Sequence, residues 1–225
     1  MTIVDHILAG ALVVACVAQL FVSIDASKLD RATLYKAGTA SGLLFGGLPL
    51  LAWGLAGRPL SGFGLFGWTG ALPAALAVGA AWAAGLLLLV RLIRGGAWRE
   101  TLTAYYRRFD WIMPRDRREL GASRAVSLVA GSGEEIAFRG FLLWYLASQA
   151  GLPAAILVSS LVFGAAHSYQ KKAGIVFATV AGLVLGLAYA ASGSLPLVMW
   201  IHATWNMASF AVGRMLLSPE AGEKL

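Results

Sequence analysis

The chain has 225 residues, of which 59% are hydrophobic and only 13% are charged, and its mean hydropathy is +0.74. This composition excludes an ordinary soluble domain, which needs a mixed polar surface, and predicts an all-α integral membrane protein. The single cysteine, Cys16, excludes a disulfide framework within these residues and a cysteine-based zinc site.

Long apolar runs predict a polytopic helical bundle of about seven transmembrane helices. The expected spans are residues 3–24, 38–57, 71–93, 125–147, 153–167, 173–191 and 196–216. The first run is expected to be a retained span, because its flank carries Asp5 and lacks the basic residues of a signal peptide. The expected organisation is an N-terminal three-span region at 1–93, a basic cytoplasmic amphipathic loop at 94–124, a four-span core at 125–217 and a polar tail at 218–225.

Two connections carry a recognisable composition. Residues 58–70 are rich in glycine and contain Phe63, Phe66 and Trp68, so they are expected to lie at the membrane interface with these side chains as anchors. Residues 94–124 hold most of the arginine in the chain, which predicts a basic amphipathic segment on an anionic leaflet. Nucleic-acid binding would require a similar charge, but the membrane context argues against it.

The distribution of basic residues predicts the orientation of the chain. If seven helices alternate in direction, 16 of the 18 lysines and arginines fall on one side, Arg58 falls on the other, and Arg139 lies within the membrane. The positive-inside rule then places the N-terminus outside and the C-terminus in the cytoplasm. The net charge of +7 therefore reports topology and does not indicate an acidic ligand.

The fourth expected span contains an unusual group of charges. Residues 131–146 read GSGEEIAFRGFLLWYL and place Glu134, Glu135 and Arg139 inside an apolar helix. A charged side chain near the bilayer centre costs at least about 2.5–3.5 kcal/mol, so such residues usually face a protein interior and mark a functional site. Glu135 and Arg139 are four residues apart and can pair along one helix face, whereas Glu134 points about 100° away. The pair is expected to be structural, and Glu134 is expected to be available for chemistry.

Two histidines follow in later spans. His167 closes the stretch Phe163-Gly-Ala-Ala-His167, and His202 opens the stretch His202-Ala-Thr-Trp-Asn206, so each pair shares a helix face. A lone membrane histidine is more often a hydrogen-bonded packing residue than a catalyst. Together with Glu134, however, these side chains supply a base, an imidazole that can share a proton, and a donor for a developing oxyanion.

In these motifs the chain resembles the CAAX-protease and bacteriocin-processing (CPBP) family of intramembrane endopeptidases. The family pattern is Glu-Glu-x-x-x-Arg, then Phe-x-x-x-His, then His-x-x-x-Asn/Asp, and all three occur here in order, beginning at Glu134, Phe163 and His202. The resemblance covers about residues 123–217. It implies that Glu134 activates water with help from His167, and that His202 and Asn206 stabilise the oxyanion. The implied catalytic residues are Glu134, His167, His202 and Asn206, and the implied orienting residues are Glu135, Arg139 and Phe163.

The resemblance also implies a reaction and a location. The reaction is hydrolysis of a peptide bond in a membrane-associated peptide or protein, such as one with a prenylated C-terminus, a bacteriocin leader or a C-terminal sorting tail. The location is the plasma membrane of a prokaryote. The family is often labelled metalloprotease, and two histidines with one or two glutamates could either ligate zinc or act on water directly. Because no His-Glu-x-x-His helix occurs here, direct glutamate catalysis without a required cofactor is favoured.

Two other classes of function remain open. One is a nonproteolytic immunity or scaffold protein on the same fold. The presence of all the polar residues of the family motifs argues against it. The other is a proton-coupled transporter, against which the lack of paired inverted halves argues. The catalytic hypothesis also requires the side chains to meet. At about 1.5 Å per residue, Glu134 and His167 are expected near mid-membrane and His202 nearer the outer end, so helix tilt or an earlier helix start must bring them together.

Overall fold

The computed structural model describes residues 1–22, 26–65, 72–94, 96 and 98–217, and within these residues the regular elements are all helical. The predicted all-α class is therefore confirmed. The α-helices are α1 (Ile3–Ala18), α2 (Arg31–Leu55), α3 (Leu72–Arg94), α4 (Arg99–Arg107), α5 (Arg117–Glu135), α6 (Leu143–Ala150), α7 (Leu152–Ala165), α8 (Lys171–Ser192) and α9 (Leu195–Leu217). A π-helical segment, η4 (Ile136–Leu142), joins α5 to α6, and short 3-10 segments form η1 (Ala26–Lys28), η2 (Leu60–Phe63) and η5 (Ser168–Gln170).

The helices support a helical membrane bundle, but they do not support seven spans in full. Three helices in the described part of the chain are both long and apolar enough to cross a membrane: Arg31–Leu55, Leu72–Arg94 and Ser168–Ser192. α1 and α7 are apolar but have only 16 and 14 residues. Apolar runs thus predict where helices lie, whereas the length of each helix depends on its caps and neighbours.

Several predicted helix boundaries are wrong for a common reason. α2 begins at Arg31, because the Asp30 carboxylate accepts the Thr33 N–H at 2.9 Å. α5 begins at Arg117, inside the predicted 94–124 loop, because Asp116 caps it in the same way. The first turns of both helices are polar, so hydropathy does not mark them. α1 ends at Ala18, whereas the predicted end of the first span, residue 24, lies outside the described residues.

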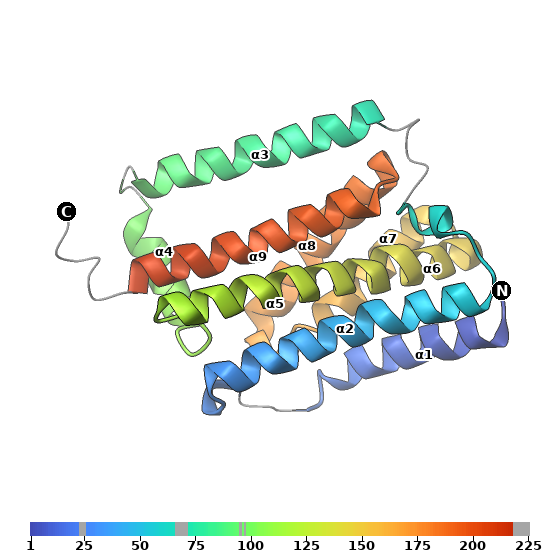
Figure 1. Cartoon of the computed structure of the whole chain (residues 1–225), viewed down its shortest axis with the longest axis horizontal. Coiled ribbons are helices and arrows are strands. Elements are labelled where there is room, and N and C mark those ends of the chain that lie inside the picture. The colour runs from blue at the N-terminus through green and yellow to red at the C-terminus, as the bar shows by residue number, and fades with distance from the viewer. Residues whose placement is uncertain (23–25, 66–71, 95, 97, 218–225) are drawn as a thin grey trace.

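α5, η4 and α6 follow one another as a continuous rod through the bundle, with α2 and α9 packed against α5 (Figure 1). The contact between α2 and α5 is unusually close. A Cβ atom on Gly133 would fall 1.9 Å from the carbonyl oxygen of Gly42, so a glycine is needed for the two backbones to approach. This contact fixes α5 directly before Glu134.

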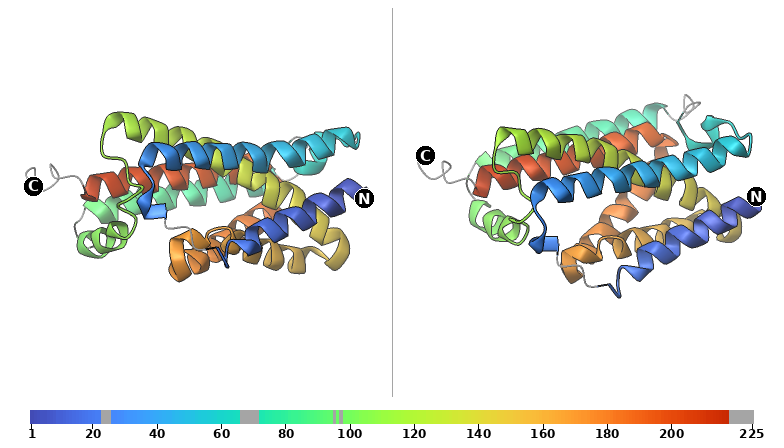
Figure 2. Two further views of the ribbon diagram at one scale, coloured as in Figure 1. Left: turned by 90° about the horizontal axis from the view of Figure 1, so that it is seen from below. Right: turned by 60° about the horizontal axis from the view of Figure 1, so that its bottom comes forward.

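α1, α7 and α8 lie together beside this rod (Figure 2). α7 packs against α6 and α8, and α1 packs against α7. The core between these helices is aromatic, with Phe138, Phe141 and Phe163 buried in one cluster. Charged residues that enter this region therefore have little access to water.

α3 lies at the edge of the bundle beside α9 (Figure 1). Only 6% of the most apolar stretch of this helix is buried, so most of its surface faces outward. Trp82 anchors it to α9, because the indole Nε1–H donates to Thr204 Oγ1 at 3.0 Å.

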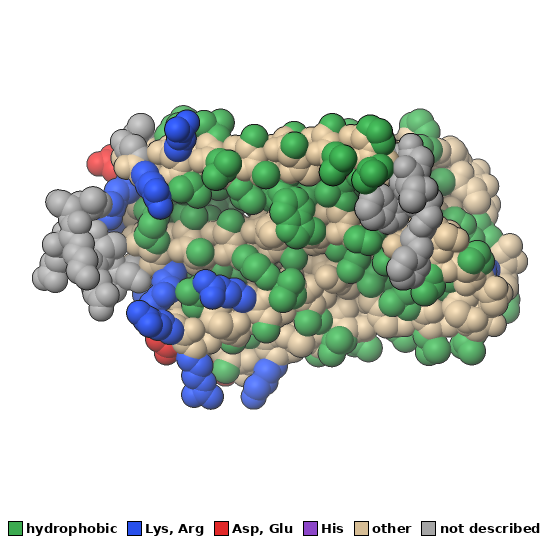
Figure 3. Space-filling model, turned by 45° about the horizontal axis from the view of Figure 1, so that its top comes forward, with side chains coloured by type: hydrophobic (Ala, Val, Ile, Leu, Met, Phe, Trp, Pro, Cys, Tyr) green, Lys and Arg blue, Asp and Glu red, His purple; other side chains and the backbone are tan. Residues whose placement is uncertain are grey.

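Basic side chains gather at one end of the bundle, near α4 (Figure 3). At this end Tyr106 of α4 packs with Met113 and Leu216, so the apolar face of α4 covers the last turns of α9. The contact of this end with an anionic leaflet stays a prediction. The exposed arginines here are Arg91, Arg94, Arg107, Arg108, Arg115, Arg117, Arg118 and Arg124.

Arg58 lies apart from those arginines, after the far end of α2. Its guanidinium donates to both carboxylate oxygens of Asp5, at 2.8 and 2.5 Å. The same guanidinium lies over the rings of Trp53 and Trp144, at 5.0 and 4.8 Å. This ion pair ties the first turn of α1 to the ends of α2 and α6.

The prediction that Phe63 is an interfacial anchor is wrong. Phe63 is fully buried, and its ring centroid lies 4.2 Å from that of Trp53. It fills space beside Gly140, where a Cβ atom would come within 2.3 Å of the Phe63 ring. A glycine in η4 therefore creates a site for an aromatic side chain, which composition alone does not reveal. Phe66 and Trp68, the other two predicted anchors, lie outside the described residues.

Candidate active site

Glu134 and Glu135 lie where α5 ends and η4 begins. The sequence predicts a helix here, and the structure continues the helix through the seven residues of η4 in π-helical form. π-helical turns are rare and occur frequently at functional sites. All seven residues of η4 are buried, so the segment places Arg139 in the interior of the bundle.

Glu135 is the centre of a buried charge network. Its Oε1 accepts hydrogen bonds from Arg139 Nη1 at 2.9 Å and from His202 Nδ1 at 2.7 Å. The Glu135 side chain is fully buried, and that of Arg139 is 1% exposed. The pairing of Glu135 with Arg139 is thus as the spacing predicts, and the link to His202 on α9 is new. A buried charge without partners is strongly destabilising, so the network depends on all of its members.

Arg139 makes two further contacts that complete its surroundings. Its Nη2 donates to the carbonyl oxygen of Gly182 on α8 at 3.0 Å. The guanidinium carbon also lies 4.6 Å from the ring centroid of Phe163 on α7, in a cation–π arrangement. Side chains and backbone from α5, α7 and α8 therefore enclose this one cation.

Glu134 faces the two histidines. Its Oε2 lies 3.9 Å from His167 Nε2 and 3.8 Å from His202 Nε2. These separations exceed hydrogen-bond length, and within the described residues Glu134 Oε2 is buried without a hydrogen-bond partner. The Glu134 side chain as a whole is 17% exposed, so the site is enclosed but not sealed.

The hydrogen bonds of the two imidazoles fix which nitrogen faces Glu134. His167 Nδ1 lies 2.8 Å from the carbonyl oxygen of Phe163, and a carbonyl only accepts, so this nitrogen is the donor. The Glu135 carboxylate likewise receives the Nδ1–H of His202. Each Nε2 therefore points toward Glu134 and, in a neutral ring, is an acceptor. The Glu134 Oε2 and the two Nε2 atoms therefore converge on one region at separations that a small polar molecule could bridge.

The positions at which the helices begin and end along the bundle axis explain how these side chains meet. Because α5 starts at Arg117, Glu134 lies 17 residues, about 26 Å, along it, farther from the basic end than the predicted start at 125 would allow. α7 ends at Ala165 after only 14 residues, so His167 lies at a distance from the basic end of the bundle. α9 begins at Leu195, a few residues before His202. These unequal lengths bring the three residues to one level.

Asn206 is the candidate that the network does not include. It lies one helical turn beyond His202 on α9 and is partly exposed. Across the described residues, no hydrogen bond joins its side chain to the other candidates. The structure brings together the remaining six: Glu134, Glu135, Arg139, Phe163, His167 and His202.

Two residues near the network were not singled out by the sequence. Tyr169 stacks on His167 with ring centroids 6.0 Å apart, and its hydroxyl accepts a hydrogen bond from Gln170 Nε2 at 3.0 Å. Gly182 offers its carbonyl to Arg139. The sequence offers one weak indication that Tyr169 is near the site, namely that it lies two residues after His167. Gly182 had none, because one glycine among several in an apolar helix carries no chemical signature.

The arrangement does not fit a metal ion as it stands. A catalytic zinc site normally supplies three protein ligands and keeps a position for water. In the described part of the chain, no three His, Cys, Asp or Glu side chains are arranged to hold a metal ion. Glu134, His167 and His202 therefore do not form a coordination site in this arrangement, and no step below is derived through a metal.

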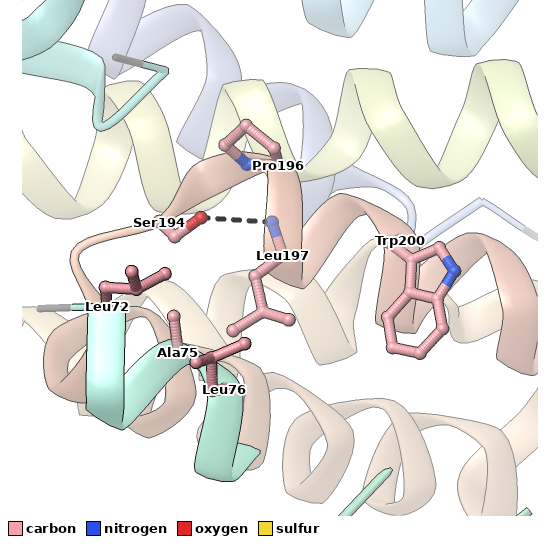
Figure 4. Close-up of a pocket in the computed structure, with 7 residues that line it drawn as sticks. All are labelled: Leu72, Ala75, Leu76, Ser194, Pro196, Leu197 and Trp200. Carbon is pink, nitrogen blue, oxygen red and sulfur yellow. Dashed lines mark hydrogen bonds between the residues drawn. The ribbon is translucent and has the colours of Figure 1, made fainter. Parts of the chain in front are cut away.

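A separate apolar groove lies between the first turns of α3 and α9 (Figure 4). It contains none of the candidate site residues. Its hydroxyl, Ser194 Oγ, already accepts the backbone N–H of Leu197 at 3.3 Å. The groove therefore offers an apolar surface and no reactive group. Its lining residues are Leu72, Ala75, Leu76, Ser194, Pro196, Leu197 and Trp200.

Part of the chain matches a known protein family. Residues 118–208 match the family model described as type II CAAX prenyl endopeptidase Rce1-like. The matched region begins in α5 and ends in α9 just beyond Asn206, so it includes every candidate site residue. No curated protein and no solved structure matches the chain.

Proposed function

We propose, from the match of residues 118–208 to the type II CAAX prenyl endopeptidase Rce1-like family model, that the chain is an intramembrane endopeptidase in which Glu134 activates the attacking water. The observation that carries this proposal is the position of Glu134 Oε2, 3.9 and 3.8 Å from the Nε2 atoms of His167 and His202. A carboxylate and two imidazoles directed at one point can hold a water molecule and move its proton.

The attacking water is assigned to the space between these three atoms. One water oxygen at about 2.8 Å from each partner can bridge gaps of this size. It donates one hydrogen to Glu134 Oε2 and the other to His167 Nε2, whose Nδ1–H is held by the Phe163 carbonyl. Glu134 is then the base, and His167 holds the water in place.

The proposed reaction proceeds through a tetrahedral intermediate. Glu134 takes a proton from water as the water oxygen bonds to the scissile carbonyl carbon, and the carbonyl π electrons move to oxygen. When the C–N bond breaks, its electron pair stays on nitrogen, and Glu134 returns the proton to the leaving amine. One residue therefore acts as base and then as acid.

The oxyanion needs hydrogen-bond donors, and His202 is assigned the first of them. Because Glu135 holds Nδ1–H at 2.7 Å, a protonated His202 ring directs its second N–H, on Nε2, into the site. Asn206 is assigned the second donor, from its amide. Arg139 is assigned the role of balancing the charge of the Glu135 carboxylate, to which it donates at 2.9 Å.

The family match and the membrane setting support a proposal for the substrate class. The family description names a prenyl endopeptidase, and a peptide bearing a prenyl group is held at a membrane by that group. We propose a membrane-associated peptide as substrate, cleaved near its lipidated terminus. We also propose that the basic end of the bundle is cytoplasmic and that the membrane is the plasma membrane of a prokaryote.

Cleavage of a defined peptide tests the proposed function. The purified protein in phosphatidylcholine vesicles is given a quenched fluorescent peptide ending in Cys-a-a-X, with the cysteine farnesylated or left free. The expected result is cleavage of the farnesylated peptide, with one new N-terminus identified by mass spectrometry. Glu134→Gln is nearly isosteric but cannot accept the proton, so it should lose about 10²-fold or more in rate while remaining folded.

Other outcomes distinguish the alternatives. Full turnover by Glu134→Gln would remove Glu134 from the mechanism. Binding of the farnesylated peptide without cleavage by the wild-type protein would favour a nonproteolytic scaffold. Glu134-dependent proton flux across the vesicles, again without cleavage, would favour a transporter.

A further inference from the structure

A chain of hydrogen bonds leads from α8 to the proposed reaction centre. The Gly182 carbonyl accepts Arg139 Nη2 at 3.0 Å, and Arg139 Nη1 donates to Glu135 Oε1 at 2.9 Å. The same Oε1 accepts His202 Nδ1 at 2.7 Å. We propose that Gly182 is a positioning residue, which fixes Arg139 and, through Glu135, the direction of His202 Nε2. This proposal rests on the proposed endopeptidase function.

Space is the reason for a glycine at this position. A Cβ atom on Gly182 would lie 3.1 Å from both Cα and Cβ of Ser160 on α7 and 3.3 Å from Arg139 Nη2. Gly182 lies within α8 and is not among the described glycines with a positive φ, so backbone conformation does not require glycine. A side chain here would displace either α7 or the guanidinium.

The Arg139 guanidinium is closely surrounded by other side chains, so it has little space in which to move. The Arg139 side chain is 1% exposed, and its guanidinium carbon lies 4.6 Å from the ring centroid of Phe163. A displacement must therefore pass to Glu135, whose Oε1 is shared between Arg139 and His202. The ring of His202 would turn, and its Nε2 would leave its present distance from Glu134.

The chain provides a matched control one turn farther along α8. A Cβ atom on Gly186 would also come within 3.1 Å of α7, but the atom it meets is Ile156 Cγ2. The three atoms nearest to that Cβ all belong to the Ile156 side chain. Both alanines would press on α7, Gly182→Ala at the Cα and Cβ atoms of Ser160 and Gly186→Ala at the Ile156 side chain, and Gly182→Ala would also press on Arg139.

Kinetics with the farnesylated fluorescent peptide provides the first readout. Because its Cβ atom would shift Ser160 or Arg139 by a few tenths of an ångström, Gly182→Ala should lower kcat by about 3- to 10-fold while KM changes by no more than about twofold. Gly186→Ala should stay within about twofold of the wild type in both constants. Arg139→Lys should resemble Gly182→Ala, since a lysine cannot stack on Phe163 and donate in two fixed directions.

Nitrogen-15 NMR of histidine-labelled protein in detergent provides a second readout that does not require activity. The Nδ1–H signal of His202, assigned with His202→Gln, should shift in Gly182→Ala and Arg139→Lys and stay unchanged in Gly186→Ala. An unchanged His202 signal in folded Gly182→Ala would overturn the proposal, as would equal effects of the two alanines. If Gly182→Ala does not fold, an unchanged signal in Arg139→Lys overturns it. Failure of wild-type cleavage would count against the proposed function and leave this spectral comparison valid.

Discussion

His202 on α9 and Glu135 on α5 are joined across the helix interface, with His202 Nδ1 only 2.7 Å from Glu135 Oε1. The carboxylate therefore does more than neutralise Arg139. It fixes the tautomer and the ring direction of a histidine whose other nitrogen lies 3.8 Å from Glu134. Two adjacent glutamates thus flank the same imidazole, with Glu135 hydrogen-bonded to Nδ1 and Glu134 Oε2 lying 3.8 Å from Nε2.

Glu135→Gln should separate these two roles. The amide oxygen can still accept the His202 hydrogen bond, but the charge that balances Arg139 is gone. We expect a partial loss of cleavage, about 10- to 100-fold, smaller than the loss for Glu134→Gln, together with a lower melting temperature in detergent. Complete retention of both activity and stability would show that the buried pair does not support the site.

Gly133→Ala tests the close contact that holds α5 in place. Its Cβ atom would fall 1.9 Å from the Gly42 carbonyl oxygen, so α2 and α5 must separate. Overpacking of this kind usually costs about 1–3 kcal/mol, so thermal unfolding in detergent should shift downward. Gly47→Ala is the control on α2, because no atom lies within 4 Å of its Cβ. Equal stability of the two variants would contradict the importance of this contact.

Cysteine labelling tests the proposed orientation. In a Cys16→Ala background, Arg108→Cys at the basic end should react with an impermeant thiol reagent only from the cytoplasmic side. Ala191→Cys, an exposed position near the other end of α8, should react only from outside. Labelling in the reverse sense would overturn the orientation, and labelling of both positions from one side would overturn the alternation of helices.

Removal of metal ions tests the choice of direct glutamate catalysis. We expect cleavage of the farnesylated peptide to survive exhaustive treatment with a strong chelator, and purified active protein to contain far less than one equivalent of zinc. If Glu134, His167 and His202 were all ligands, Glu135 would be the remaining carboxylate base, and it is already held by Arg139 and His202. Loss of activity on chelation, with recovery on adding zinc, would refute the metal-free mechanism.

Helical periodicity predicted the features that lie within one helix. The spacing of Glu135 and Arg139 indicates an ion pair, and the structure shows their Nη1 and Oε1 atoms 2.9 Å apart. The apolar runs likewise predict where helices lie, because burial in a bundle or in lipid selects the same residues. Periodicity failed where polar caps extend a helix, as at Asp30, and it did not show that η4 is π-helical.

The sequence by itself therefore determined the all-helical class and the pairing of Glu135 with Arg139, since each depends on composition or on spacing along one helix. The candidate catalytic residues were instead implied by the resemblance of three motifs to a known family. Only the tertiary structure decided that Glu135 also holds His202, that Gly182 supports Arg139, and that Phe63 is buried beside Gly140. These contacts join different helices. They depend on the relative height and rotation of α5, α8 and α9, which are set by helix length and close packing and which no local pattern in the chain records.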